Sequence, residues 1–168
     1  MPRPDRVSPA SRRRPSRVLL LFSAALLLGS AAGAEQGDRS QRMPLLPQYQ
    51  QECSACHVAY PPRMLPAASW QRLMGGLSSH FGTDASLDAD TVRQVAAWLG
   101  ANAGSGRRMA EPPPEDRITR SAWFIHEHGE IPAATWRRAS VRSAANCAAC
   151  HTRAEQGDFN EHFVRIPR

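Results

Sequence analysis

All four cysteines of this 168-residue chain lie in two copies of one short pattern, C-x-x-C-H, at residues 53–57 and 147–151. On a helix, positions i, i+3 and i+4 share one face, so each copy is expected to present two thiols and an imidazole together. This is the attachment sequence of a c-type haem, in which the thiols form thioethers with the porphyrin and the histidine ligates the iron. The sequence therefore predicts two covalently attached haem c groups, held by Cys53, Cys56, Cys147 and Cys150, with His57 and His151 as axial ligands.

Three other uses of the cysteines explain less of the pattern. Two disulfides, which suit an exported chain, leave both following histidines without a role. A zinc site made of two C-x-x-C pairs usually has them about 15–20 residues apart, whereas 90 residues separate Cys56 from Cys147. A thioredoxin-like redox pair requires a strand–helix–strand context, and no strand pattern flanks either copy.

Each iron needs a second axial ligand, and four further histidines are available. His80 continues the apolar stripe of a predicted helix, which favours it as a ligand. His128 follows Phe124 by four residues and so lies on the apolar side of the next such helix, which favours it over His126. His162 lies in an irregular tail and is expected at the surface.

A methionine ligand is the main alternative, and it would raise the haem potential relative to histidine; the candidates are Met64, Met74 and Met109. By proximity we expect His80 to share an iron with His57, and His128 with His151, with crossed ligation as the alternative. Two histidines per iron leave no open coordination site. Such a haem passes electrons and does not readily bind oxygen or peroxide.

The N-terminus has the features of an export signal. Basic residues at 12–17 precede an apolar run at 18–28 and a small-residue site at 32–34. This order predicts a secretory signal peptide over residues 1–34 and a periplasmic mature protein without stable membrane insertion, the alternative being an uncleaved anchor. The first 34 residues also carry six arginines against one acidic residue, and the other 134 carry 15 against 14. The main body therefore lacks the clustered charge of a nucleic-acid binder.

The patterning after residue 34 predicts an all-α fold. Helices are expected at 47–60, 69–82, after Asp88, from Ser121 to about His128, near Trp136 and after Ser143. Glycines and prolines mark residues 104–117 as a linker between a first half (35–103) and a second half (118–168). Only 20 of the last 134 residues are Leu, Ile, Val or Phe, so each helical half is expected to wrap around one haem in place of aliphatic side chains.

Four segments resemble the small dihaem cytochromes c of bacterial periplasms: 53–66 (CSACHVAYPPRMLP), 69–82 (SWQRLMGGLSSHFG), 121–130 (SAWFIHEHGE) and 144–159, with the RIPR ending. The resemblance covers nearly all of residues 47–168. It implies a helical protein with one haem per half and two histidines per iron, and it maps the second ligands onto His80 and His128.

The resemblance also implies electron transfer without chemistry on a substrate, and redox partners that are other periplasmic haem proteins or membrane b-type cytochromes. Arginines in the main body could dock an acidic partner; the candidates are Arg107, Arg108, Arg137, Arg138 and Arg142. The alternative function is a small haem peroxidase or reductase, or a haem-based sensor. Each of these needs an iron with an open site.

Overall fold

The computed structural model describes residues 43–168, and the predicted signal peptide lies outside this range. Five α-helices form its framework: α2 (Pro47–Cys53), α3 (Ala67–Gly75), α4 (Ala89–Ala101), α5 (Ala122–Glu127) and α6 (Ala133–Trp136). Eight short 3-10 helices connect them: Pro62–Met64, Leu77–Ser79, Arg107–Met109, Pro114–Asp116, Ile118–Arg120, Cys147–Ala149, Ala154–Gln156 and Glu161–Phe163. Extended pairing within residues 43–168 is limited to isolated bridges. The all-α prediction is confirmed.

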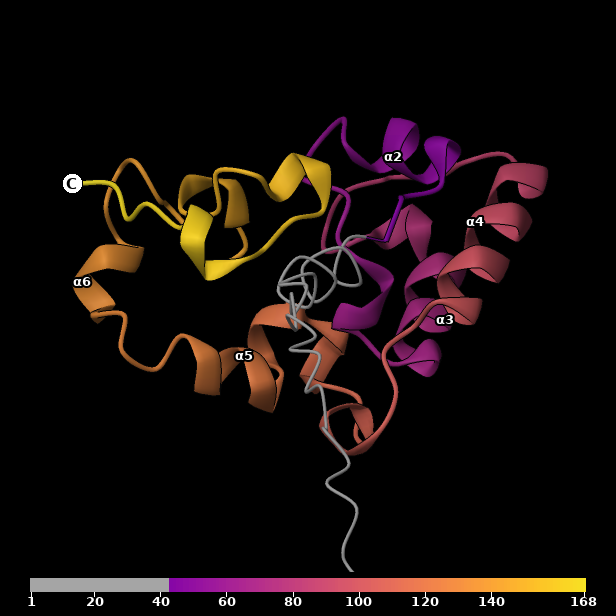
Figure 1. Cartoon of the computed structure of the whole chain (residues 1–168). Helices are drawn as coiled ribbons and strands as arrows, with labels where there is room; N and C mark the ends of the chain where they lie inside the picture. Colours follow the sequence, from indigo (N-terminus) through magenta and orange to yellow (C-terminus); the bar gives the residue numbers. More distant parts are fainter. Residues whose placement is uncertain (1–42) are drawn as a thin grey trace, which may run out of the picture.

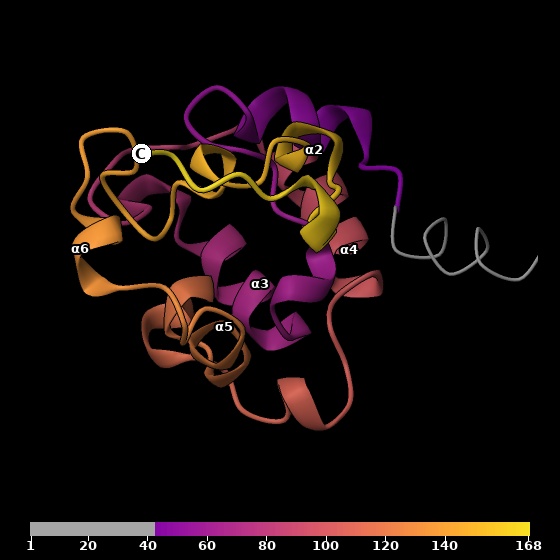
Figure 2. The ribbon, with the colours of Figure 1, turned by 60° about the vertical axis from the view of Figure 1, so that its left-hand side comes forward.

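The two halves of the chain lie side by side (Figure 1). Helices α2, α3 and α4 form one side, and α6 with the C-terminal turns forms the other, with α5 between them. Turning the molecule shows the C-terminal segment crossing over the top towards α2 and α4 (Figure 2). Over the described residues, no helix has both the length and the apolar character to cross a bilayer.

The hydrophobic core belongs to the first half. It consists of seven buried side chains: Tyr49, Ala59, Leu65, Trp70, Met74, Val95 and Leu99. The apolar residues buried in the second half are only Phe124, Val141 and Ala154 among those described. The second half thus buries fewer apolar side chains than the first, although its share of Leu, Ile, Val and Phe is no lower.

Helix α4 forms where its sequence predicts it. Asp88 is the N-cap, and its carboxylate accepts hydrogen bonds from the backbone amides of Asp90 and Thr91. Val95 and Leu99, one turn apart, are fully buried and face α3. Ser121 likewise caps α5 by accepting from the amide of Phe124, as predicted.

The predicted helix at 69–82 is wrong at both ends. It begins at Ala67 after Pro66, so Ser69 lies inside the helix and does not cap it. It ends at Gly75, because two consecutive glycines, each costing about 1 kcal/mol in a helix interior, meet there. A 3-10 turn follows, and His80 lies at its C-terminal end instead of on the α3 stripe.

Neither haem-attachment motif lies on a continuous helix, contrary to prediction. Helix α2 stops at Cys53, since the next three residues are exposed and offer no apolar face to pack, and the two prolines at 61 and 62 hold the preceding chain extended. The second motif starts a 3-10 helix at Cys147. Ser143 does not cap it; the Ser143 hydroxyl accepts from the amide of Ala145.

The segment at residues 104–117 is attached to the first half at both of its ends. The amide of Gly104 donates to the carbonyl of Leu65 at 2.9 Å. At the other end, Arg72 of α3 makes two hydrogen bonds to the carboxylate of Asp116, at 2.8 and 2.6 Å. These contacts fix where α5 begins relative to α3.

Candidate haem sites

The structure brings the imidazole of the first motif histidine, His57, close to that of His80. The ring centres of His57 and His80 are 6.2 Å apart, with their planes inclined by 31°. His57 comes from the turn after α2, and His80 from the turn after α3. The packing of α2 and α3 around one core therefore sets this distance.

A second pair forms in the other half. The ring centres of His128 and His151 are 6.1 Å apart, with an interplanar angle of 64°. His128 is the C-cap of α5, and His151 follows the 3-10 helix Cys147–Ala149. A bridge between His151 and Val164 holds this turn against the C-terminal tail.

Both distances fit a six-coordinate haem iron. Two imidazoles that bind one metal ion from opposite sides, each through a nitrogen about 2 Å away, have their ring centres roughly 6 Å apart. The Nδ1 atoms of His80 and His151 are buried without a hydrogen-bond partner in the protein. The residues present thus suit a haem, and each C-x-x-C-H motif contributes one histidine to its own pair.

The other histidine of each pair is oriented by a backbone carbonyl. The Nδ1 atom of His57 lies 2.7 Å from the carbonyl oxygen of Val58, and that of His128 lies 3.0 Å from the carbonyl oxygen of Phe124. A proton on Nδ1, donated to the carbonyl, leaves the Nε2 lone pair free for a metal. This hydrogen bond fixes both the tautomer and the direction of the ring.

Burial favours the neutral form of the remaining two imidazoles. It lowers the pKa of His80, and the nearby His57 lowers it further. Burial likewise lowers the pKa of His151, with a further contribution from His128. Neutral imidazole is the form that ligates a metal, so the environment favours the ligating state.

Aromatic rings contact all four imidazoles. Tyr60 stacks on His57 at 4.8 Å between ring centres, and Phe124 stacks on His128 at 4.0 Å. Phe81 contacts His80, and Phe159 contacts His151. These contacts restrict the rotation of the imidazoles. The sequence patterns did not single out these contacts, although the spacings His57–Tyr60 and Phe124–His128 match one helical turn.

No two of the four cysteines pair in a disulfide, so all four are available for thioether bonds to haem. Burial raises the pKa of Cys53 and of Cys147 to about 11. Cys56 is exposed, and Cys150 is partly buried. Each motif therefore has one cysteine set into the protein and one nearer its surface.

The other candidate ligands have different surroundings. His126 and His162 are exposed. Met74 is buried in the core of the first half, and Met109 lies against Gly104. The backbone carbonyl of Met64 accepts a hydrogen bond from the indole of Trp123.

A helical fold in which each half pairs a motif histidine with a second histidine defines the class of c-type cytochromes with two haem sites. The sequence profile of the dihaem cytochrome c family matches residues 49–159. The chain belongs to this family, whose general role is electron transfer, and it carries two covalently bound haem c groups. No functionally curated protein matches it.

Solved structures of bacterial dihaem cytochromes c are similar over most of their length. One from Shewanella baltica OS155 is 36% identical, covers 74% of this chain and 95% of its own, and has a TM-score of 0.64. Two from Rhodobacter sphaeroides are 43% and 44% identical, with TM-scores of 0.61 and 0.60. They cover 70% and 68% of this chain and 100% and 96% of their own.

When bound, each haem supplies an iron that takes up or releases one electron. The protein's part is to hold this iron without moving. The backbone carbonyl and the aromatic ring beside each of His57 and His128 would keep these two imidazoles in a fixed orientation.

Proposed function

We propose that the protein is an exported electron carrier in which both irons have two histidine ligands and no substrate is transformed. His57 and His80 ligate one iron, and His128 and His151 ligate the other. The observation that carries this proposal is the short distance between the two imidazoles of each pair, with ring centres 6.2 Å apart in the first and 6.1 Å apart in the second. With both axial positions taken, each iron keeps the same ligands when it is oxidised and reduced.

The spectrum of the holoprotein and its response to carbon monoxide test this proposal. The reduced wild type, produced with a haem-ligation system, is expected to be fully low-spin and not to bind carbon monoxide. An alkaline pyridine haemochrome assay is expected to give two haems per chain. A high-spin component or carbon monoxide binding in the wild type would instead support the enzyme or sensor function, since both need an open site.

The same preparation tests export. The intact mass is expected to correspond to a chain that begins near Glu35 with two haems attached. A mass that includes residues 1–34 would contradict cleavage of the predicted signal peptide.

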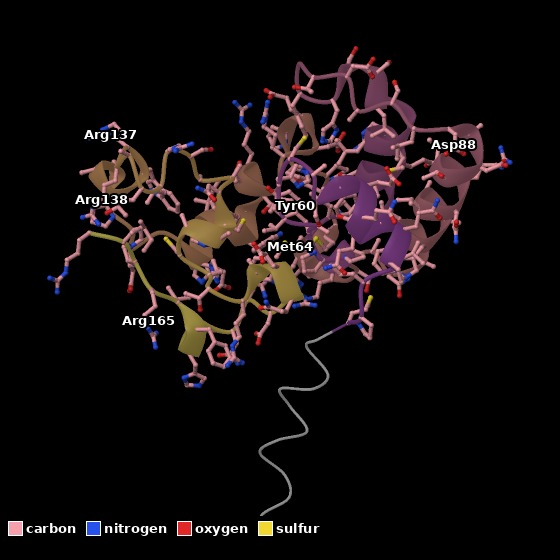
Figure 3. All side chains as sticks on the ribbon, turned by 90° about the horizontal axis from the view of Figure 1, so that it is seen from above. Tyr60, Met64, Asp88, Arg137, Arg138 and Arg165 are labelled. Carbon is pink, nitrogen blue, oxygen red and sulfur yellow. The ribbon has the colours of Figure 1, made fainter. Side chains whose placement is uncertain are left out.

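We further propose that the redox partner is a periplasmic haem protein or a membrane b-type cytochrome with an acidic docking face. Arg137, Arg138 and Arg165 lie at one end of the second half (Figure 3). Arg137 and Arg138 are exposed, and Arg138 acts electrostatically on Cys150 of the second motif. This charge is therefore close to a haem attachment point, where a partner must approach.

The docking proposal predicts a rate that depends on salt. Electron transfer from an acidic cytochrome to the double variant Arg137→Gln/Arg138→Gln is expected to be slower and less sensitive to ionic strength than with wild type. Arg93→Gln, which removes an exposed charge from α4 in the first half, is the matched control. Equal rates for the three proteins would exclude docking at this end.

A further inference from the structure

Tyr60 touches both halves of the molecule. Its ring stacks on the imidazole of His57 with 4.8 Å between centres and 16° between planes. Its hydroxyl donates a 2.9 Å hydrogen bond to the carbonyl oxygen of Ala145. Ala145 precedes the first cysteine of the second motif, Cys147, by two residues. One side chain thus links an imidazole of the first site to the attachment segment of the second.

The Tyr60 backbone is held firmly on the side of the first half. Tyr49 is a core residue that is only 2% exposed, and its hydroxyl donates a 2.8 Å hydrogen bond to the carbonyl oxygen of Tyr60. Pro61 and Pro62, which are fully buried, follow directly and fix the chain direction. Tyr60 is therefore anchored by the core and projects its hydroxyl out of it.

The acceptor is held on the side of the second half. The amide of Ala145 donates to the hydroxyl of Ser143 at 3.1 Å. The side-chain amide of Asn146 donates to the carbonyl of Val141 at 3.0 Å, and Val141 is fully buried. The hydrogen bond from Tyr60 thus joins two anchored segments.

The position of Tyr60 is also the position where the halves meet. Tyr60 and Met64 lie together between the two parts of the molecule (Figure 3). The Met64 carbonyl accepts from the indole nitrogen of Trp123, next to α5 residue Phe124, which stacks on His128. The five-residue segment from Tyr60 to Met64 therefore makes contacts that lead to both histidine pairs.

We propose that Tyr60 is a positioning residue that couples the two haem centres, fixing the His57 imidazole relative to the second attachment segment and providing the direct connection for electron exchange between them. The inference rests on the proposed function, because it requires His57 to be an iron ligand. In the exchange, one iron goes from ferrous to ferric while the other goes from ferric to ferrous. No bond or proton is transferred, and the tyrosine is neither oxidised nor reduced.

The test compares three variants of the dihaem protein. Tyr60→Phe removes the hydrogen bond and keeps the stacked ring, and Tyr60→Leu removes both. Asn102→Ala is the matched control, because it removes one side-chain-to-backbone hydrogen bond of 2.8 Å within the first half. The measurements are the rate of electron exchange between haems after partial photoreduction, the separation of the two midpoint potentials, and hydrogen exchange in residues 145–151.

In Tyr60→Phe the loss of a hydrogen bond worth about 1 kcal/mol should speed hydrogen exchange in residues 145–151 about fivefold. Electron exchange between the haems should slow severalfold, and the separation of the midpoint potentials should change. Tyr60→Leu should slow electron exchange further and alter the ferric low-spin signal of the first centre alone. The control should match wild type in all three measurements.

The inference is overturned if Tyr60→Phe, folded and low-spin, matches the control in hydrogen exchange and in electron exchange. A loss of thermal stability alone, with unchanged midpoint potentials and an unchanged rate of electron exchange between the haems, also overturns the inference. Tyr60 would then have a purely structural role. Failure of the proposed function gives a different result: the wild type itself would then bind carbon monoxide.

Discussion

His128 lies 6.1 Å from His151 between ring centres, whereas His126, two residues earlier, faces solvent. The helix backbone causes this difference. The Nδ1 atom of His128 lies 3.0 Å from the carbonyl oxygen of Phe124 one turn earlier, and its ring stacks on the Phe124 ring at 4.0 Å. His126 is rotated away from this contact by two residues of α5.

Replacing these two histidines separates their roles. His128→Ala is expected to open one of the two irons, giving a high-spin component and carbon monoxide binding at one haem per chain. His126→Ala is expected to keep the low-spin spectrum of the wild type. Visible spectra with and without carbon monoxide check both. A low-spin His128→Ala protein would show that another side chain ligates the second iron.

The two oxidised centres are expected to differ in their electron paramagnetic resonance. An imidazole donates π electrons into the iron d orbital perpendicular to its own plane. As the proposed ligands, the rings of His57 and His80, inclined by 31°, would act mainly on one orbital, whereas those of His128 and His151, inclined by 64°, would act on two. The second centre should therefore show the larger maximum g value. Two indistinguishable low-spin signals in the wild type would contradict these angles.

Gly104 and Gly100 test how closely the segment after α4 packs, because a methyl group added at the first would clash and one added at the second would not. A Cβ atom at Gly104 would lie 2.4 Å from the carbonyl oxygen of Arg63 and 2.8 Å from Met109 Cγ. Gly104→Ala is therefore expected to destabilise the protein by about 1–3 kcal/mol. Gly100→Ala meets nothing within 4 Å and lies inside α4, so it is expected to stabilise by up to about 1 kcal/mol. Denaturant unfolding of the two holoproteins measures both, and a neutral Gly104→Ala would contradict the close approach.

The ion pair between Arg72 and Asp116 is expected to make stability depend on pH. The hydrogen bonds from Arg72 lower the pKa of Asp116 below its ordinary value of 3.8. The contribution of this ion pair to the free energy of unfolding is therefore fully present above pH 3.8, the ordinary pKa of the carboxyl group. It is lost as the pH falls through the lowered pKa of Asp116. Asp116→Asn should unfold at a lower denaturant concentration than wild type at neutral pH, with the difference vanishing in strong acid.

Asparagine suits this test because Asp116 has φ = 55°, a conformation that asparagine tolerates. Glu111→Gln, which removes an exposed carboxylate from the same segment, is the control and should leave stability unchanged. A difference between Asp116→Asn and wild type that persists in strong acid would mean that the pair is not its cause.

The features predicted correctly from sequence are those with a local cause. Asp88 and Ser121 cap helices because a carboxylate or hydroxyl reaches amides two or three residues ahead. The predicted extent of α3 is wrong, because the glycine pair at 75 and 76 ends the helix although the apolar stripe continues to His80. His80 reaches its position through a 3-10 turn and the left-handed residues Phe81 and Gly82.

The contacts that join distant parts of the chain were beyond prediction from local patterns. The hydrogen bond from Tyr60 to Ala145 spans 85 residues, and no periodicity relates the two positions. The same holds for the pairing of Trp123 with the carbonyl of Met64, 59 residues away. Both contacts depend on how the halves pack, which the pattern of each half does not contain.

The unequal burial in the two halves has a consequence for how the molecule matures. Leu65, Val95 and Leu99 are already fully enclosed by protein, so the N-terminal part can collapse before its porphyrin arrives. In the C-terminal part few apolar side chains are buried, so we expect a haem to supply much of the apolar interior. Attachment of haem to this part is thus expected to be a folding step as well as a chemical one. A newly made chain that lacks the second haem should be the species that proteases degrade.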